Sequence, residues 1–133
     1  MCYSTMAAEK TFENKLKRWL ISRGIYPLGT DISNVTVPPI GYSLKRWGGG
    51  QYTKSGLPDM QIVVKGVCIE AELKAPNGRP SELQKQKIRQ INESGGIGFI
   101  LYPKHFDDFK KFVIELEKGN IDYANELFKG RLV

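Results

Sequence analysis

Apolar residues recur along the chain at two spacings, one typical of helices and the other typical of strands. Repeats of three or four residues predict helices, and these lie at about 8–23, 81–94, 106–119 and 121–128. Short apolar runs predict strands, and these lie at about 41–47, 60–64, 67–73 and 97–102. This order predicts a single α/β domain spanning 1–133, with a small mixed β-sheet flanked by helices.

Local motifs mark where several of these elements begin and end. Lys65-Gly66, between two apolar runs, predicts the tight turn of a β-hairpin. Ser81 followed by Gln84 is a capping-box pattern that opens a helix. The strand after that helix is expected to lie parallel to the strand before it. The segment 25–55 is broken by prolines and glycines, which is typical of a long functional loop.

The composition excludes several classes of protein. The 133 residues are 41% hydrophobic and 26% charged, which suits one folded domain with its own core. No stretch approaches the ~20 apolar residues of a membrane-spanning helix, and Met1–Lys10 lacks the apolar run of a signal peptide. We therefore expect a cytoplasmic protein without a membrane partner.

Cysteine and histidine are too scarce to suggest a zinc site or a histidine-based triad. The two cysteines have no metal-binding spacing, and Cys68, inside an apolar run, is predicted to be a small core residue. The single histidine is His105. Any bound metal should therefore be held by carboxylates, which favour Mg²⁺ or Mn²⁺.

The net charge of +6 is concentrated in the first part of the chain, where eight basic and three acidic residues precede residue 57. A local excess of positive charge of this kind predicts a polyanionic partner. A glycine run at 48–50 lies among basic residues, which is typical of a loop that follows a phosphate backbone. Trp47 either stacks on an exposed base or anchors the loop. The candidate DNA contacts are Lys45, Arg46, Trp47, Lys54 and Ser55.

Charged residues alternate along the predicted strand 67–73 and just beyond it. Glu70, Glu72 and Lys74 are two residues apart and therefore share one face. The hairpin brings Asp59, which begins the partner strand, alongside them. Two carboxylates and a lysine in one place are suited to holding Mg²⁺ and stabilising negative charge. The residues alone leave open a solvated edge strand with a Glu–Lys ladder.

The chain resembles the PD-(D/E)XK nuclease superfamily, and within it the VRR-NUC family, especially the small stand-alone members encoded by phages and prophages. The resemblance covers roughly 9–118. It rests on Phe12-Glu13-Asn14-Lys15, Arg46-Trp47-Gly48-Gly49-Gly50, Thr53-Lys54-Ser55-Gly56-Leu57-Pro58-Asp59, Glu72-Leu73-Lys74-Ala75, Pro80-Ser81-Glu82-Leu83-Gln84 and Gly95-Gly96 before a strand.

The resemblance implies a restriction-endonuclease-like core and a Mg²⁺- or Mn²⁺-dependent DNA endonuclease of a bacterial or phage-infected cell. It further implies selectivity for branched DNA, as in Holliday-junction resolvases that act as homodimers. The phenylalanine-rich C-terminal helices would form either the dimer interface or part of the core. Alternatives are a flap- or nick-directed nuclease and a non-catalytic nucleic-acid-binding module.

The resemblance also assigns roles to residues of the hairpin. Asp59 and Glu72 are the expected metal-binding carboxylates, and the Leu73 carbonyl is an expected further ligand. Lys74 is the expected catalytic lysine.

Two residues outside the hairpin are expected to complete the site. Glu13 matches the first-helix glutamate that reaches the metal, although it is also spaced to pair with Lys17 on a helix surface. Gln84 matches a glutamine that orders the site, although it also suits a capping box alone. The stretch Thr30–Ser43 is longer than in the smaller family members and is expected to affect substrate choice.

Overall fold

A five-stranded mixed sheet forms the centre of the fold. The computed structural model describes residues 3–46 and 56–128. The strands lie in chain order across the sheet, with the pairs β1–β2 and β4–β5 parallel and the two central pairs antiparallel. They are β1 (Ile25–Pro27), β2 (Gly41–Lys45), β3 (Met60–Val64), β4 (Val67–Leu73) and β5 (Ile97–Leu101). The predicted α/β class with a mixed sheet is confirmed.

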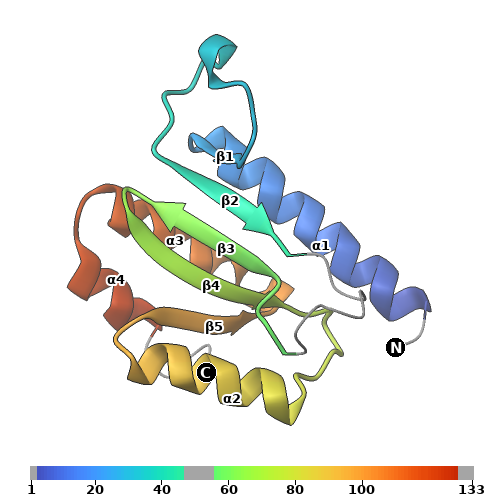
Figure 1. Ribbon diagram of the computed structural model, residues 1–133. Helices are drawn as coiled ribbons and strands as arrows, with labels where there is room; N and C mark the ends of the chain where they lie inside the picture. The colour runs from blue at the N-terminus through green and yellow to red at the C-terminus, as the bar shows by residue number, and fades with distance from the viewer. Residues whose placement is uncertain (1–2, 47–55, 129–133) are drawn as a thin grey trace.

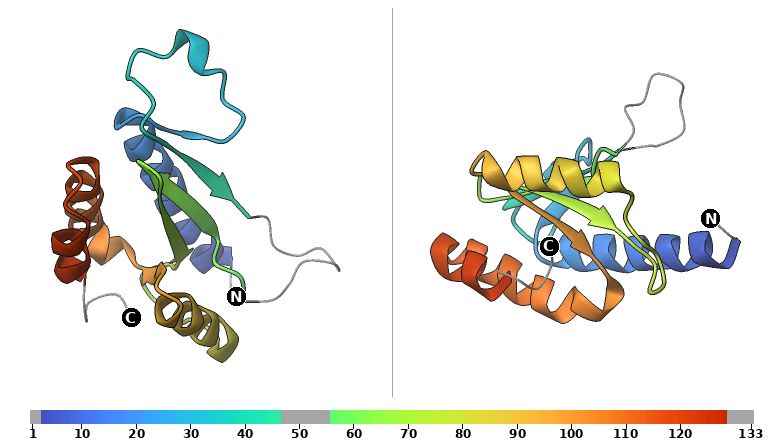
Figure 2. Two further views of the ribbon diagram at one scale, coloured as in Figure 1. Left: turned by 60° about the vertical axis from the view of Figure 1, so that its left-hand side comes forward. Right: turned by 90° about the horizontal axis from the view of Figure 1, so that it is seen from below.

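Helices cover both faces of this sheet (Figures 1 and 2). They are α1 (Tyr3–Ser22), α2 (Glu82–Glu93), α3 (Phe106–Glu117) and α4 (Ile121–Phe128), with short 3₁₀ turns at Ile32–Asn34 and Pro103–His105. The view from below shows α2 on one face and the other three helices on the opposite face (Figure 2). No helix within the described ranges is long and apolar enough to cross a membrane.

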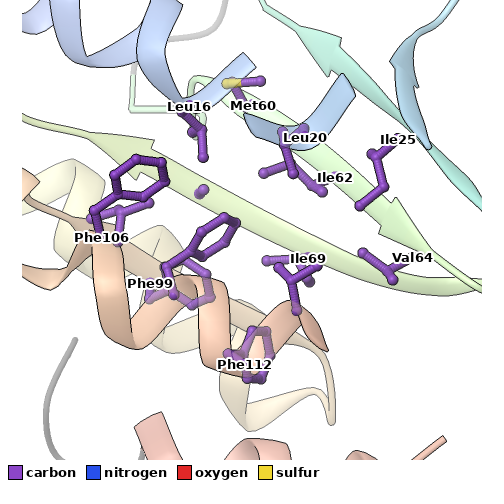
Figure 3. Close-up of a cluster of buried hydrophobic side chains, with 14 of the residues drawn as sticks. Leu16, Leu20, Ile25, Met60, Ile62, Val64, Ile69, Phe99, Phe106 and Phe112 are labelled. Atoms are coloured by element: carbon purple, nitrogen blue, oxygen red, sulfur yellow. The ribbon is translucent and has the colours of Figure 1, made fainter. Parts of the chain in front are cut away.

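The main core lies between the sheet and the layer of α1 and α3 (Figure 3). Alternate residues of β3 and β4 point into it, because successive strand side chains face opposite ways. Phe99 meets Phe109 and Phe112 edge-on, with ring centroids 6.0 Å apart in both pairs. Both α3 phenylalanines are fully buried. Of the two roles open for the C-terminal phenylalanines, these two side chains therefore serve the core.

The β-hairpin forms at the predicted residues because its turn is encoded locally. Lys65 and Gly66 have φ angles of 50° and 83°, the two positive values that a tight hairpin turn requires. The capping box also forms, since the Gln84 backbone amide donates to the Ser81 side chain and the Ser81 backbone amide donates to the Gln84 side chain.

Two local predictions differ from the structure. Cys68 is exposed, because strand alternation places it on the opposite face from buried Ile69. The prediction of a core cysteine was therefore wrong. β1 was not predicted, because this three-residue strand contains Pro27 and exists through its pairing with β2. Beyond β1, the 28–40 segment projects from one end of the sheet (Figure 1).

Candidate active site

β4 supplies the centre of the candidate site. It lies between β3 and β5, so it is not an edge strand. Glu72 and Lys74 are only 2% and 5% exposed, and the Lys74 Nζ lies 3.5 Å from Glu72 Oε2. The alternative of a solvated edge ladder is therefore wrong. Two buried ionisable groups are costly unless they are paired or serve a function.

Asp59, the residue just before β3, joins this centre. Its Oδ2 accepts a hydrogen bond of 2.9 Å from the Leu73 backbone amide. The antiparallel register that pairs Met60 with Ala71 brings the two strands to this position. The hairpin thus brings together Asp59, Glu72 and Lys74 as the sequence predicts, whereas the Leu73 carbonyl as a metal ligand stays a prediction.

The Glu72 carboxyl is in an environment that opposes its negative charge. Burial is the main effect that raises the Glu72 pKa, and the neighbouring Asp59 charge raises it further. Lys74 lowers the pKa but does not outweigh them, so the Glu72 pKa reaches about 8. Its Oε1 is buried without a hydrogen-bond partner among the described residues. Native proteins rarely leave such an oxygen unsatisfied, and a proton or a cation would satisfy it.

Gln84 makes both the capping contact and a contact with the candidate site. Its Oε1 accepts a hydrogen bond of 2.9 Å from the Ser81 amide, which completes the capping box. Its Nε2 donates a hydrogen bond of 3.0 Å to Glu72 Oε2. The first turn of α2 therefore fixes the orientation of the Glu72 carboxylate.

Glu13 lies in α1 and is only 4% exposed, within reach of three lysines. Its Oε2 lies 2.9 Å from Lys10 Nζ and 2.8 Å from Lys17 Nζ. Its Oε1 lies 3.0 Å from Lys45 Nζ. Burial alone would raise the Glu13 pKa, but hydrogen bonds from Lys17, Lys10 and Lys45 outweigh it and lower the pKa to about 2. The predicted Lys17 pair forms, but around a buried carboxylate.

Glu9 is a further acidic residue near the site that the sequence analysis did not identify. It lies one helical turn before Glu13, and its Oε2 is buried without a hydrogen-bond partner among the described residues. Burial and then the Asp59 charge raise the Glu9 pKa. The signal in the sequence was the four-residue spacing from Glu13, which places both side chains on one helix face.

The predicted DNA contacts divide into two groups. Trp47, Lys54 and Ser55 lie outside the described residues. Lys45 is 18% exposed and pairs with Glu13 and with Asp59 Oδ1, the latter at 3.7 Å.

Arg46 is fixed within the protein. Its guanidinium pairs with Glu70 and donates to Gln61 Oε1 at 3.2 Å and to the Pro58 carbonyl at 3.0 Å. Its backbone amide donates to the Asp59 carbonyl at 2.7 Å. Arg46 therefore fastens β2 to the segment that carries Asp59, and its role as a DNA contact stays a prediction.

The carboxylates fit a hard cation only in part. Asp59 and the unpartnered Glu72 oxygen are the oxygen donors that Mg²⁺ prefers. Among the described residues, however, no three acidic, histidine or cysteine side chains gather closely enough to hold a metal ion. Lysines engage both oxygens of Glu13.

Comparisons with protein-family models, with curated proteins and with solved structures find no match to this chain.

Proposed function

We propose that this protein is a metal-dependent DNA endonuclease with a restriction-endonuclease-like core. The observation that carries the proposal is the buried Glu72, with an unpartnered oxygen, an acidic neighbour and a lysine at 3.5 Å. Most buried side-chain oxygens in native proteins have a partner, and a bound divalent cation would supply one for Glu72 Oε1.

In this proposal each residue has a distinct task. Asp59 and Glu72 would hold Mg²⁺ or Mn²⁺, with the Leu73 carbonyl and Glu13 as further ligands. The bound cation would polarise the phosphodiester and lower the pKa of a bound water.

The remaining two residues act beside the metal. Lys74 has its ammonium next to Glu72, where it would orient the attacking water and stabilise negative charge in the transition state. Gln84 is a positioning residue, because its amide holds the Glu72 oxygen that faces it.

The same site supports the finer proposal of a VRR-NUC family nuclease that cuts branched DNA as a homodimer. The motif order along the chain supports the family. The basic excess before residue 57 supports a polyanionic substrate. A two-fold dimer would present two sites for symmetric incision. A flap- or nick-directed nuclease would use the same residues, and a non-catalytic module would bind DNA without cutting it.

Cleavage of labelled four-way junction, flap and plain duplex DNA, with Mg²⁺ or Mn²⁺, tests the proposal. We expect Lys74→Met to abolish cutting while DNA binding, measured in EDTA, is retained. Lys85→Met is the matched control, because Lys85 is 42% exposed and pairs with Glu82 on α2. Wild-type protein that binds these DNAs but cuts none of them with either metal would refute the enzyme.

A further inference from the structure

A lysine ammonium lies between two of the proposed metal-binding carboxylates. Lys45 Nζ is 3.0 Å from Glu13 Oε1 and 3.7 Å from Asp59 Oδ1. Lys45 therefore offsets part of the negative charge of both carboxylates in the metal-free protein.

Three separate elements bring these groups together. Lys45 ends β2, and the antiparallel register pairs it with Met60, the residue after Asp59. Glu13 reaches the same place from α1. The contact of Lys45 with Asp59 and Glu13 therefore depends on the tertiary fold, and the register of β2 against β3 places Lys45 next to Asp59.

Lys45 differs in this respect from the other lysines around Glu13. Lys10 and Lys17 pair with Glu13 from the same helix, at spacings of three and four residues. Among the residues that the structure describes, Lys45 is the lysine that pairs with both Glu13 and Asp59. If Lys45 moved away, Glu13 would still keep two cationic neighbours, whereas Asp59 would lose its ion pair.

We propose that Lys45 is the internal counter-ion of the metal site, and that its ammonium and a divalent cation compete for Asp59 and Glu13. The inference rests on the proposed function. It also gives Lys45 two successive partners: the carboxylates in the metal-free protein and, once the cation displaces it, a phosphate of the bound DNA. Metal binding would then prepare the basic surface for the substrate.

Mn²⁺ affinity, measured by electron paramagnetic resonance without DNA, tests the competition. We expect Lys45→Met to bind Mn²⁺ roughly tenfold or more tightly than wild type, because the cation then binds without first displacing an ammonium from Asp59 and Glu13, whose Coulomb attraction near a protein surface exceeds this factor. Lys45→Arg keeps the charge and should remain close to wild type. Lys17→Met is the matched control, since it removes a cation that pairs with Glu13 and not with Asp59, and should give a smaller gain.

The outcomes separate this inference from the proposed function. Wild-type binding of Mn²⁺ that Asp59→Asn abolishes and Lys45→Met leaves unchanged would overturn the competition and keep the metal site. Absence of Mn²⁺ binding in wild type and in Lys45→Met alike would overturn the metal site itself. If Lys45→Met does not fold, as judged by circular dichroism, Lys45→Gln replaces it in the same comparison.

Discussion

The stability of the metal-free protein should fall as the pH rises through the neutral range, and Glu72 should be the cause. Its pKa is raised from 4.5 to about 8 in the folded protein. An acid whose folded-state pKa is raised binds a proton more tightly when folded, so its contribution to stability is complete below pH 4.5. That contribution is lost as the pH rises through about 8.

The size of the effect follows from the shift and from the burial of the group. One pKa unit corresponds to about 1.4 kcal/mol. Glu72 is 2% exposed, so solvent screens it little. The free energy of unfolding should therefore fall by up to about 4 kcal/mol between roughly pH 5 and pH 9. Glu72→Gln removes the titration and should abolish most of this decline.

Urea unfolding in EDTA, followed by circular dichroism across this pH range, measures the decline. Glu70→Gln is the matched control, because Glu70 lies on the same face of β4 and pairs with Arg46; that variant should keep the decline. Added Mg²⁺ should flatten the decline in wild type, since a cation stabilises the charged carboxylate. Parallel profiles for wild type and Glu72→Gln in EDTA would refute the reasoning.

Three further predictions concern the residues that support the site. Glu13→Gln should lower the free energy of unfolding at neutral pH by about 1–3 kcal/mol. Since the Glu13 pKa is about 2, the difference in unfolding free energy between wild type and variant should disappear as the pH is lowered towards that value. A difference that stays constant with pH would contradict this prediction. Arg46→Lys loses the bidentate contact with Glu70 and should lower the free energy of unfolding by about 1–3 kcal/mol in urea unfolding. An unchanged urea midpoint would show that this contact does not stabilise the fold. Gly41→Ala should lower the thermal midpoint strongly, because its Cβ would lie 1.8 Å from the Val63 carbonyl oxygen; a wild-type midpoint would show that this backbone can move apart.

Local sequence was enough to predict the hairpin, the capping box and the charged face of β4. These features depend on neighbours along the chain: the turn on Lys65 and Gly66, the cap on Ser81 and Gln84, and the face on strand alternation. The same alternation places Cys68 on the face opposite to buried Ile69, although its apolar neighbours along the chain suggested a core residue.

Only the tertiary structure decided what the charged residues contact. Glu13 lies among lysines from two elements, and Arg46 turns inward to Glu70. Gln84 reaches Glu72 while it caps α2. The physical reason is that ion pairs and burial depend on residues distant in the chain, whose approach is set by sheet register and helix packing. The sequence determines which residues can ionise, whereas the partner and the pKa of each such residue depend on the fold.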